Sequence, residues 1–130
     1  MFKVIMLVKK RTDITRDEFI EHYDNVHVPF MHDLLPQGAA IHRRNFVVPL
    51  PTAGAGADSG TELERECDAI VEVFYEDLET AERAMRCLSD PRIRSLMEQD
   101  ENRFIQPGSI RRYVVEVHET VFRPLPAKGS

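Results

Sequence analysis

The sequence has only two cysteines, Cys67 and Cys87, and neither lies beside a histidine cluster. Their number and spacing fit neither a disulfide framework nor a zinc motif, so we expect two structural thiols, as in a reducing compartment. No stretch approaches the roughly 20 continuous apolar residues that span a bilayer. The apolar first segment is followed by Lys9, Lys10 and Arg11, the reverse of the charge order in a secretion signal. We therefore expect a cytoplasmic protein with no membrane partner.

Basic charge is also scarce, since 17 Lys and Arg stand against 22 Asp and Glu for a formal net charge of −5. Binding to nucleic acid needs a basic stripe, and the doublets Arg43-Arg44 and Arg111-Arg112 are too short to provide one. No glycine-rich loop follows a strand to cradle a phosphate, which disfavours nucleotide cofactors. The length of 130 residues, with 42% apolar and 30% charged residues, predicts one globular domain.

A capped helix is predicted between Thr15 and His27. Thr15 and Glu18 have the spacing of a capping box, in which each side chain satisfies a backbone N–H of the first turn. We expect the helix to end near His27, because Pro29 disfavours helical geometry at the residue before it. At a helix C-terminus the partial negative charge would favour a protonated imidazole, whereas burial would favour a neutral one. The sequence leaves that balance open.

The remaining apolar patterns predict four strands and two further helices. The strands are residues 2–8, 41–48, 68–75 and 110–118, and the helices begin after the caps Asp77 and Asp90 and run to about residues 88 and 102. The order strand, helix, strand, strand, helix, strand is the ferredoxin-like split βαβ arrangement, an α+β fold with one antiparallel four-stranded sheet and helices on one face.

The other face of that sheet would expose more apolar surface than a monomer tolerates, so we expect a homodimer in which two sheets face each other. Residues 49–64, rich in Gly, Ala and Pro, are expected to form a flexible loop. Residues 119–130 are expected to form an extended C-terminal tail, which leaves residues 1–118 as the folded domain.

Several short motifs occur in an informative order. They are Lys9-Lys10-Arg11, Glu18-Phe19, Tyr23, His27-Val28-Pro29, Arg44-Asn45-Phe46-Val47-Val48, Asp68 to Tyr75, and Asp100 with Arg103-Phe104-Ile105 followed by Val114-Val115-Glu116. In this order they resemble the EthD family over roughly residues 1–118. The resemblance implies a dimeric α+β barrel. It also implies a small cofactor-independent enzyme or binding protein that acts on hydrophobic, often aromatic or polyketide-like molecules.

His27 is the best catalytic candidate, and its His-x-Pro position is the most recognisable polar feature of the resemblance. Imidazole exchanges a proton near neutral pH, and the phenol of Tyr23 could donate a hydrogen bond to a substrate oxygen. Phe19 lies on the same helical stripe and would contact the substrate. A purely structural role stays open for both His27 and Tyr23. A histidine at a helix end can cap carbonyls, and a tyrosine on a core stripe can pack in the core.

Four further residues are candidates for substrate binding: Asn45, His32, Glu72 and Asp100. Asn45 could hold a carbonyl or phenol oxygen, and His32 could approach the same pocket. Glu72, if buried in its strand, would have a raised pKa and could act as an acid or orient His27. Asp100 is alternatively a helix-end salt bridge, and Glu72 an exposed residue of a half-solvated strand.

The other polar residues receive structural roles. His22 lies off the stripe and should face solvent or a strand edge, while His42 and His118 lie in strands without an evident partner. Arg43 and Arg44 point to opposite faces of their strand, so at most one reaches the cavity, where a ligand carboxylate would be its natural partner.

Three hypotheses for function follow. The first is a cofactor-free lyase or isomerase that dehydrates, cyclises, decarboxylates or isomerises a small hydrophobic substrate. The second is a small-molecule-binding or stress or degradation accessory protein without turnover. The third is a haem- or oxygen-linked oxidoreductase, with His27 or His32 as an axial ligand. We expect no metal site, because the five-residue spacing of His22, His27 and His32 does not stack ligands on one helix face.

Overall fold

A computed structural model describes residues 2–35, 38–48 and 66–126 of the chain. Its elements are β1 (Phe2–Val8), α1 (Arg16–His22), the π-helical turn η1 (Tyr23–His27), α2 (Val28–Leu34), β2 (Ile41–Phe46), β3 (Ala69–Tyr75), α3 (Leu78–Ser89), α4 (Pro91–Glu101) and β4 (Arg111–Glu116). The strands form one sheet in the order β2-β3-β1-β4, and every neighbouring pair is antiparallel. This is the predicted α+β, ferredoxin-like arrangement.

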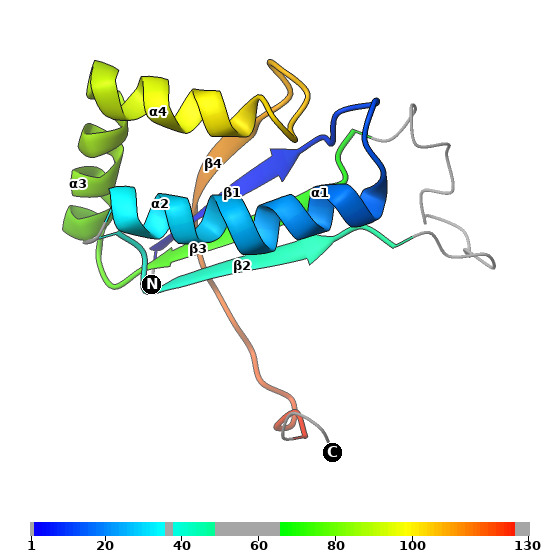
Figure 1. Cartoon of the computed structure of the whole chain (residues 1–130). Helices are drawn as coiled ribbons and strands as arrows, with labels where there is room; N and C mark the ends of the chain where they lie inside the picture. Colours follow the sequence, from blue (N-terminus) through cyan, green and yellow to red (C-terminus); the bar gives the residue numbers. More distant parts are fainter. Residues whose placement is uncertain (1, 36–37, 49–65, 127–130) are drawn as a thin grey trace.

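The helices lie on one face of the sheet (Figure 1), and the core fills the space between the two layers. Alternate strand residues such as Val4, Val8, Val71 and Val73 point into this core, where they meet side chains of the helices and of the segment after α4. The opposite face of the sheet carries no helix within the described residues. Its exposed apolar side chains include Ile41, Ile70 and Tyr113.

The predicted starts of the helices are confirmed by their caps. Thr15 Oγ1 accepts a hydrogen bond from the N–H of Glu18 at 3.1 Å, and the Glu18 carboxylate accepts one from the N–H of Thr15 at 2.9 Å. Asp77 accepts from the N–H of Thr80 at the start of α3, and Asp90 accepts from two N–H groups in the first turn of α4. Each cap satisfies backbone donors that a helix leaves unpaired.

The prediction that the first helix ends at His27 is wrong, because α1, η1 and α2 follow one another as consecutive helical segments. The N–H of Val28 donates to the carbonyl of Tyr23, five residues earlier, so the turn is widened just before Pro29. Pro29 then falls in the first turn of α2, where the missing N–H of a proline is tolerated. His27 is therefore inside a continuous helical stretch and does not lie at a helix C-terminus with unpaired carbonyls.

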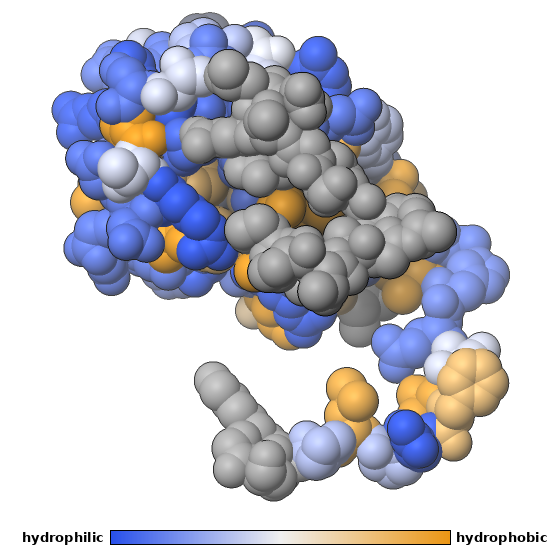
Figure 2. All heavy atoms as spheres, turned by 90° about the vertical axis from the view of Figure 1, so that its right-hand side faces the viewer, coloured by the Kyte–Doolittle hydropathy of each residue, from blue (hydrophilic) through white to orange (hydrophobic). Residues whose placement is uncertain are grey.

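Residues 119–126 follow β4 without a helix or strand, and Phe122 and Leu125 are almost fully exposed. The spheres of this tail stand apart from the rest of the molecule in Figure 2. The loop predicted at residues 49–64 lies outside the described residues, as do residues 127–130. In the described part of the chain, every helix is too short or too polar to traverse a lipid bilayer.

Candidate active site

The centre of the site is a buried histidine bound to a buried aspartate. His27 is 4% exposed, and its Nδ1 lies 2.8 Å from Oδ2 of Asp100 on α4. Because a carboxylate accepts, Nδ1 carries the proton and a neutral ring keeps a lone pair on Nε2. Burial lowers the pKa of His27, and the hydrogen bond that His27 donates to Asp100, with the charge of that carboxylate, opposes the shift without cancelling it. His27 is thus an unprotonated base near neutral pH.

The second oxygen of Asp100 is bound by another histidine. His22 Nε2 lies 3.0 Å from Oδ1 of Asp100, and the His22 ring stacks on Phe104 at 4.6 Å between centroids. The prediction that His22 faces solvent or a strand edge is wrong, because the end of α4 and the segment after it pack against that side of α1. With both oxygens occupied and 7% of the residue exposed, Asp100 holds the imidazole of His27 in place and leaves substrate contact to other groups.

Tyr23 lies beside His27 within a cluster of aromatic rings. Its ring is nearly perpendicular to that of His27, with centroids 5.5 Å apart, and it packs on Phe104 and Phe19 at 5.0 and 5.8 Å. Burial raises the pKa of the Tyr23 phenol, so the hydroxyl stays protonated and can only donate to an anionic oxygen. Phe19 is fully buried behind Tyr23 and does not line the pocket described next.

An inner pocket with a volume of about 70 Å³ opens in front of His27 and Tyr23. Its walls are mostly apolar and come from β1, β3, α2, α3, α4, β4 and the segment before β4, with Glu101 and Arg112 as charged lining residues. The apolar residues include Val4, Met6, Val8, Val73, Tyr75, Met31, Met85, Met97, Ile105 and Ile110. The sheet side of the pocket is formed by β1 and β3 with Arg112 of β4, and no residue of β2 lines it. Asn45 and Arg44 of the second predicted strand therefore do not reach this cavity, contrary to the expectation that either could contact a ligand there.

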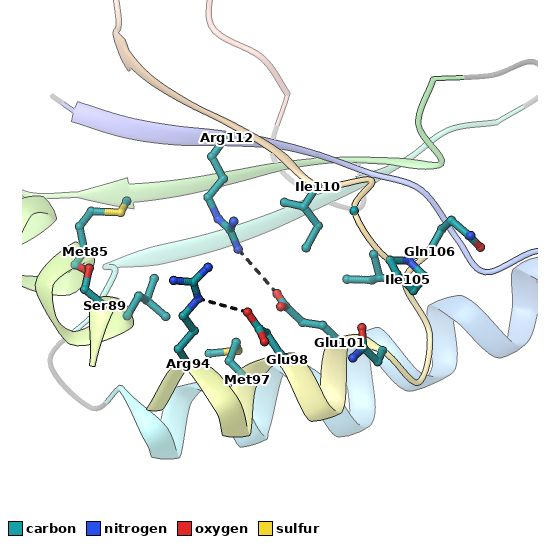
Figure 3. Close-up of a pocket in the computed structure, with 14 residues that line it drawn as sticks. Met85, Ser89, Arg94, Met97, Glu98, Glu101, Ile105, Gln106, Ile110 and Arg112 are labelled. Carbon is teal, nitrogen blue, oxygen red and sulfur yellow. Dashed lines mark hydrogen bonds and ion pairs between the residues drawn. The ribbon is translucent and has the colours of Figure 1, made fainter. Parts of the chain in front are cut away.

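The inner pocket continues into a wider groove of about 490 Å³ between α3, α4 and β4 (Figure 3). Two ion pairs lie along this groove. Arg112 of β4 approaches Glu101 at 3.7 Å, and Arg94 of α4 approaches Glu98 at 3.1 Å. Burial raises the pKa of Glu101. No sequence pattern pointed to a groove at Arg94, Glu98 or Glu101, and Arg112 was considered only as part of a basic doublet, although strand alternation would have separated it from Arg111.

Glu72 and Asn45 lie on the face of the sheet opposite the pocket. Glu72 accepts hydrogen bonds from Lys3 Nζ at 2.7 Å and from Asn45 Nδ2 at 3.1 Å. These partners, Lys3 first, lower the pKa of Glu72 instead of raising it. The expectation that Glu72 orients His27 is therefore wrong, because strand side chains alternate between faces, and Asp100 fills that role.

His32 and His42 also lie away from the reacting groups. His32 is exposed on α2 and lines neither cavity. His42 packs beside Tyr23, and its Nδ1 lies 3.2 Å from Arg44. Arg44, which had been a candidate for a ligand carboxylate, donates to Asp24 at 2.8 Å instead.

The described residues contain no group of three or more side chains able to hold a metal ion. Among the described residues that line the inner pocket, His27 is the only histidine, so its Nε2 is the ring nitrogen there that could ligate a haem iron. The volume of about 70 Å³ is far below the roughly 300–1,000 Å³ of sites that enclose a whole small molecule, so the inner pocket does not accommodate a macrocycle beside His27. The arrangement suits proton transfer to the end of a substrate whose remainder lies in the groove.

The family model of the EthD domain matches residues 11–108. The chain belongs to the EthD family. An EthD family protein from Bacillus halodurans superposes with a TM-score of 0.59 at 21% identity, covering 91% of this chain and 99% of the other. No curated protein matches at a significant level.

An Arabidopsis thaliana protein has a similar fold in two structures. One crystal structure gives a TM-score of 0.53 at 10% identity over 93% of this chain and 99% of that chain. A solution structure gives 0.53 at 9% identity over 92% and 90%. At these identities the likeness of the EthD chain to its neighbours concerns the fold alone.

Proposed function

We propose that this EthD protein is a cofactor-free lyase or isomerase in which His27 transfers a proton on a small hydrophobic substrate. The observation that carries the proposal is the hydrogen bond between His27 Nδ1 and the buried carboxylate of Asp100. It fixes the ring so that the unprotonated Nε2 is left for the pocket, and no hydrogen-bond partner of Nε2 is found within the described residues. A base positioned in this way contributes roughly 10²–10⁴-fold to a rate.

The proposed chemistry uses three polar groups, which are the imidazole of His27, the phenol of Tyr23 and the carboxylate of Asp100. Nε2 of His27 removes a proton from a carbon next to a substrate carbonyl, and the electron pair moves onto the carbonyl oxygen as an enolate. The phenol of Tyr23 donates a hydrogen bond to that oxygen, where the apolar walls strengthen it. The carboxylate of Asp100 stabilises the imidazolium, which then returns its proton to another carbon, or to a departing hydroxyl group in a dehydration.

Proton exchange tests this proposal without knowledge of the natural substrate. Aryl alkyl ketones are incubated in D₂O with the full chain, and loss of the proton next to the carbonyl is followed by NMR. We expect exchange above the buffer rate, a fall of roughly 10²–10⁴-fold in His27→Gln and of at least tenfold in Asp100→Asn. His32→Gln is the matched control, since its ring is exposed outside both cavities, and it should keep the full rate. Exchange that survives in His27→Gln would refute the proposal.

The second function considered is binding without turnover, and the size of the groove favours it as the alternative. A groove of about 490 Å³ lies within the usual range of small-molecule sites. A molecule seen by native mass spectrometry, together with no exchange by the wild type on any ketone, would identify the protein as a binding protein.

A homodimer is part of the same proposal. The face of the sheet opposite the helices presents Ile41, Ile70 and Tyr113 around the polar group of Lys3 and Glu72. A second copy applied to this face would bury those apolar side chains, and each pocket would keep its own entrance on the helical side.

A further inference from the structure

The outer groove combines an apolar floor with a charged rim. The floor is shared with the pocket at His27 and consists of Met85, Leu88, Met97, Ile105 and Ile110. Glu101 and Arg112 also line both cavities, so Arg112 lies where the groove meets the inner pocket. The rim carries Arg112 of β4 and Arg94 of α4, which Figure 3 shows pointing into the groove from opposite walls. A molecule in the groove could therefore touch cationic groups at the rim and extend over apolar surface to the reaction chamber.

Arg112 has donor capacity that its own chain leaves unused. The nearest carboxylate oxygen, on Glu101, is 3.7 Å away, beyond the 2.7–3.2 Å of an N–H···O hydrogen bond. Arg112 donates no hydrogen bond to any residue in the described ranges, and 46% of its side chain is exposed. A guanidinium carries five N–H groups in a planar fork that matches a carboxylate. The groove thus offers a fork of donors without a bonded acceptor.

The two glutamates at the rim compete weakly for these cations. The pair of Arg94 and Glu98 is exposed and lies within one helix, and such pairs contribute little. Glu101 is largely buried, which disfavours its charged form and lessens its hold on Arg112. A bound anion can therefore replace Glu101 as the partner of Arg112 with little loss of interaction energy.

We propose that the groove binds hydrophobic carboxylic acids, with the carboxylate held by Arg112 and Arg94 and the apolar chain lying on the methionine-lined floor toward His27. That such an acid is also the substrate rests on the proposed function. Its binding at Arg112 does not depend on turnover. Methionine side chains adapt to varied shapes, so the floor would accept chains that differ in length or branching.

Binding of octanoate and of 1-octanol, measured by titration calorimetry on the full chain, tests this inference. The two probes share a chain length and differ in the anionic group. We expect octanoate to bind more tightly to the wild type, and Arg112→Gln to weaken octanoate by roughly ten- to a hundredfold while leaving 1-octanol within about twofold. Arg92→Gln removes an exposed charge from α4 outside the groove and should change neither affinity.

Equal affinity of the two probes, or an equal loss for both in Arg112→Gln, would overturn the inference. The unchanged binding of 1-octanol serves as the check that Arg112→Gln is folded. If the wild type prefers octanoate over 1-octanol as expected but His27→Gln exchanges protons at the wild-type rate, only the proposed reaction is refuted. Abolished exchange in His27→Gln combined with no effect of Arg112→Gln would defeat only the recognition of acids.

Discussion

Acid should destabilise this protein through His42, a residue outside the proposed chemistry. Its Nε2 is buried and has no hydrogen-bond partner within the described residues, and its Nδ1 lies 3.2 Å from the Arg44 guanidinium. Burial, then the charges of Arg44 and His27, lower the pKa of His42 to about 4. An unperturbed histidine in the unfolded chain has a pKa of about 6.5. The folded state therefore resists the proton that the unfolded state accepts.

The sign and size of the effect follow by linkage. Between pH 6.5 and pH 4 the unfolded chain binds more protons at this position, so stability falls as the pH falls. A pKa lowered from about 6.5 to about 4 corresponds to a loss of about 2 kcal/mol between pH 7 and pH 5. Replacing His42 with leucine, which is apolar and cannot titrate, should remove this component. His27 also has a lowered pKa, but it is present in both proteins and largely cancels in the comparison.

The assay is urea denaturation followed by far-UV circular dichroism at pH 7 and pH 5, at one protein concentration because association would shift the midpoint. We expect the free energy of unfolding of His42→Leu to gain about 2 kcal/mol relative to the wild type when the pH is lowered to 5. His32→Gln, which alters an exposed histidine on α2, should follow the wild type. A difference between wild type and His42→Leu that is the same at both pH values would refute the reasoning.

Two further predictions concern the fold and the assembly. Thr15→Ala removes the capping-box acceptor at the start of α1 and should lower the free energy of unfolding by about 1 kcal/mol in urea denaturation, whereas Thr12→Ala, exposed before the cap, should have little effect; equal losses would contradict the role of the cap. Ile70→Lys places a charge on the open face of the sheet and should convert a species of twice the 15.0 kDa chain mass into a monomer in sedimentation velocity. Leu78→Lys changes a similarly exposed apolar residue on α3 and should leave the dimer intact; a wild type that sediments as a monomer would remove the dimer proposal.

The extents of the elements were largely predictable because their signals are local. The capping box at Thr15, the caps Asp77 and Asp90, and the apolar runs each act within a few residues, and the observed β1 and β3 differ from prediction by at most one residue. The prediction that the helix ends before Pro29 was wrong because it used the local preference of the residue before a proline. In the structure the π-helical turn η1 joins α1 to α2, so the helical segments are continuous across Pro29.

The sequence by itself determined the α+β fold and the resemblance to the EthD family, and it singled out His27 as a candidate, because helical period, strand alternation and motif order are local properties of the chain. Only the tertiary structure decided the partners of that histidine. Asp100 comes from a helix 73 positions later, and the pairing depends on how α4 packs against η1. Strand alternation separated the two faces of each strand, but only the packing of the helices decided which face borders the pocket and which arginines line the groove.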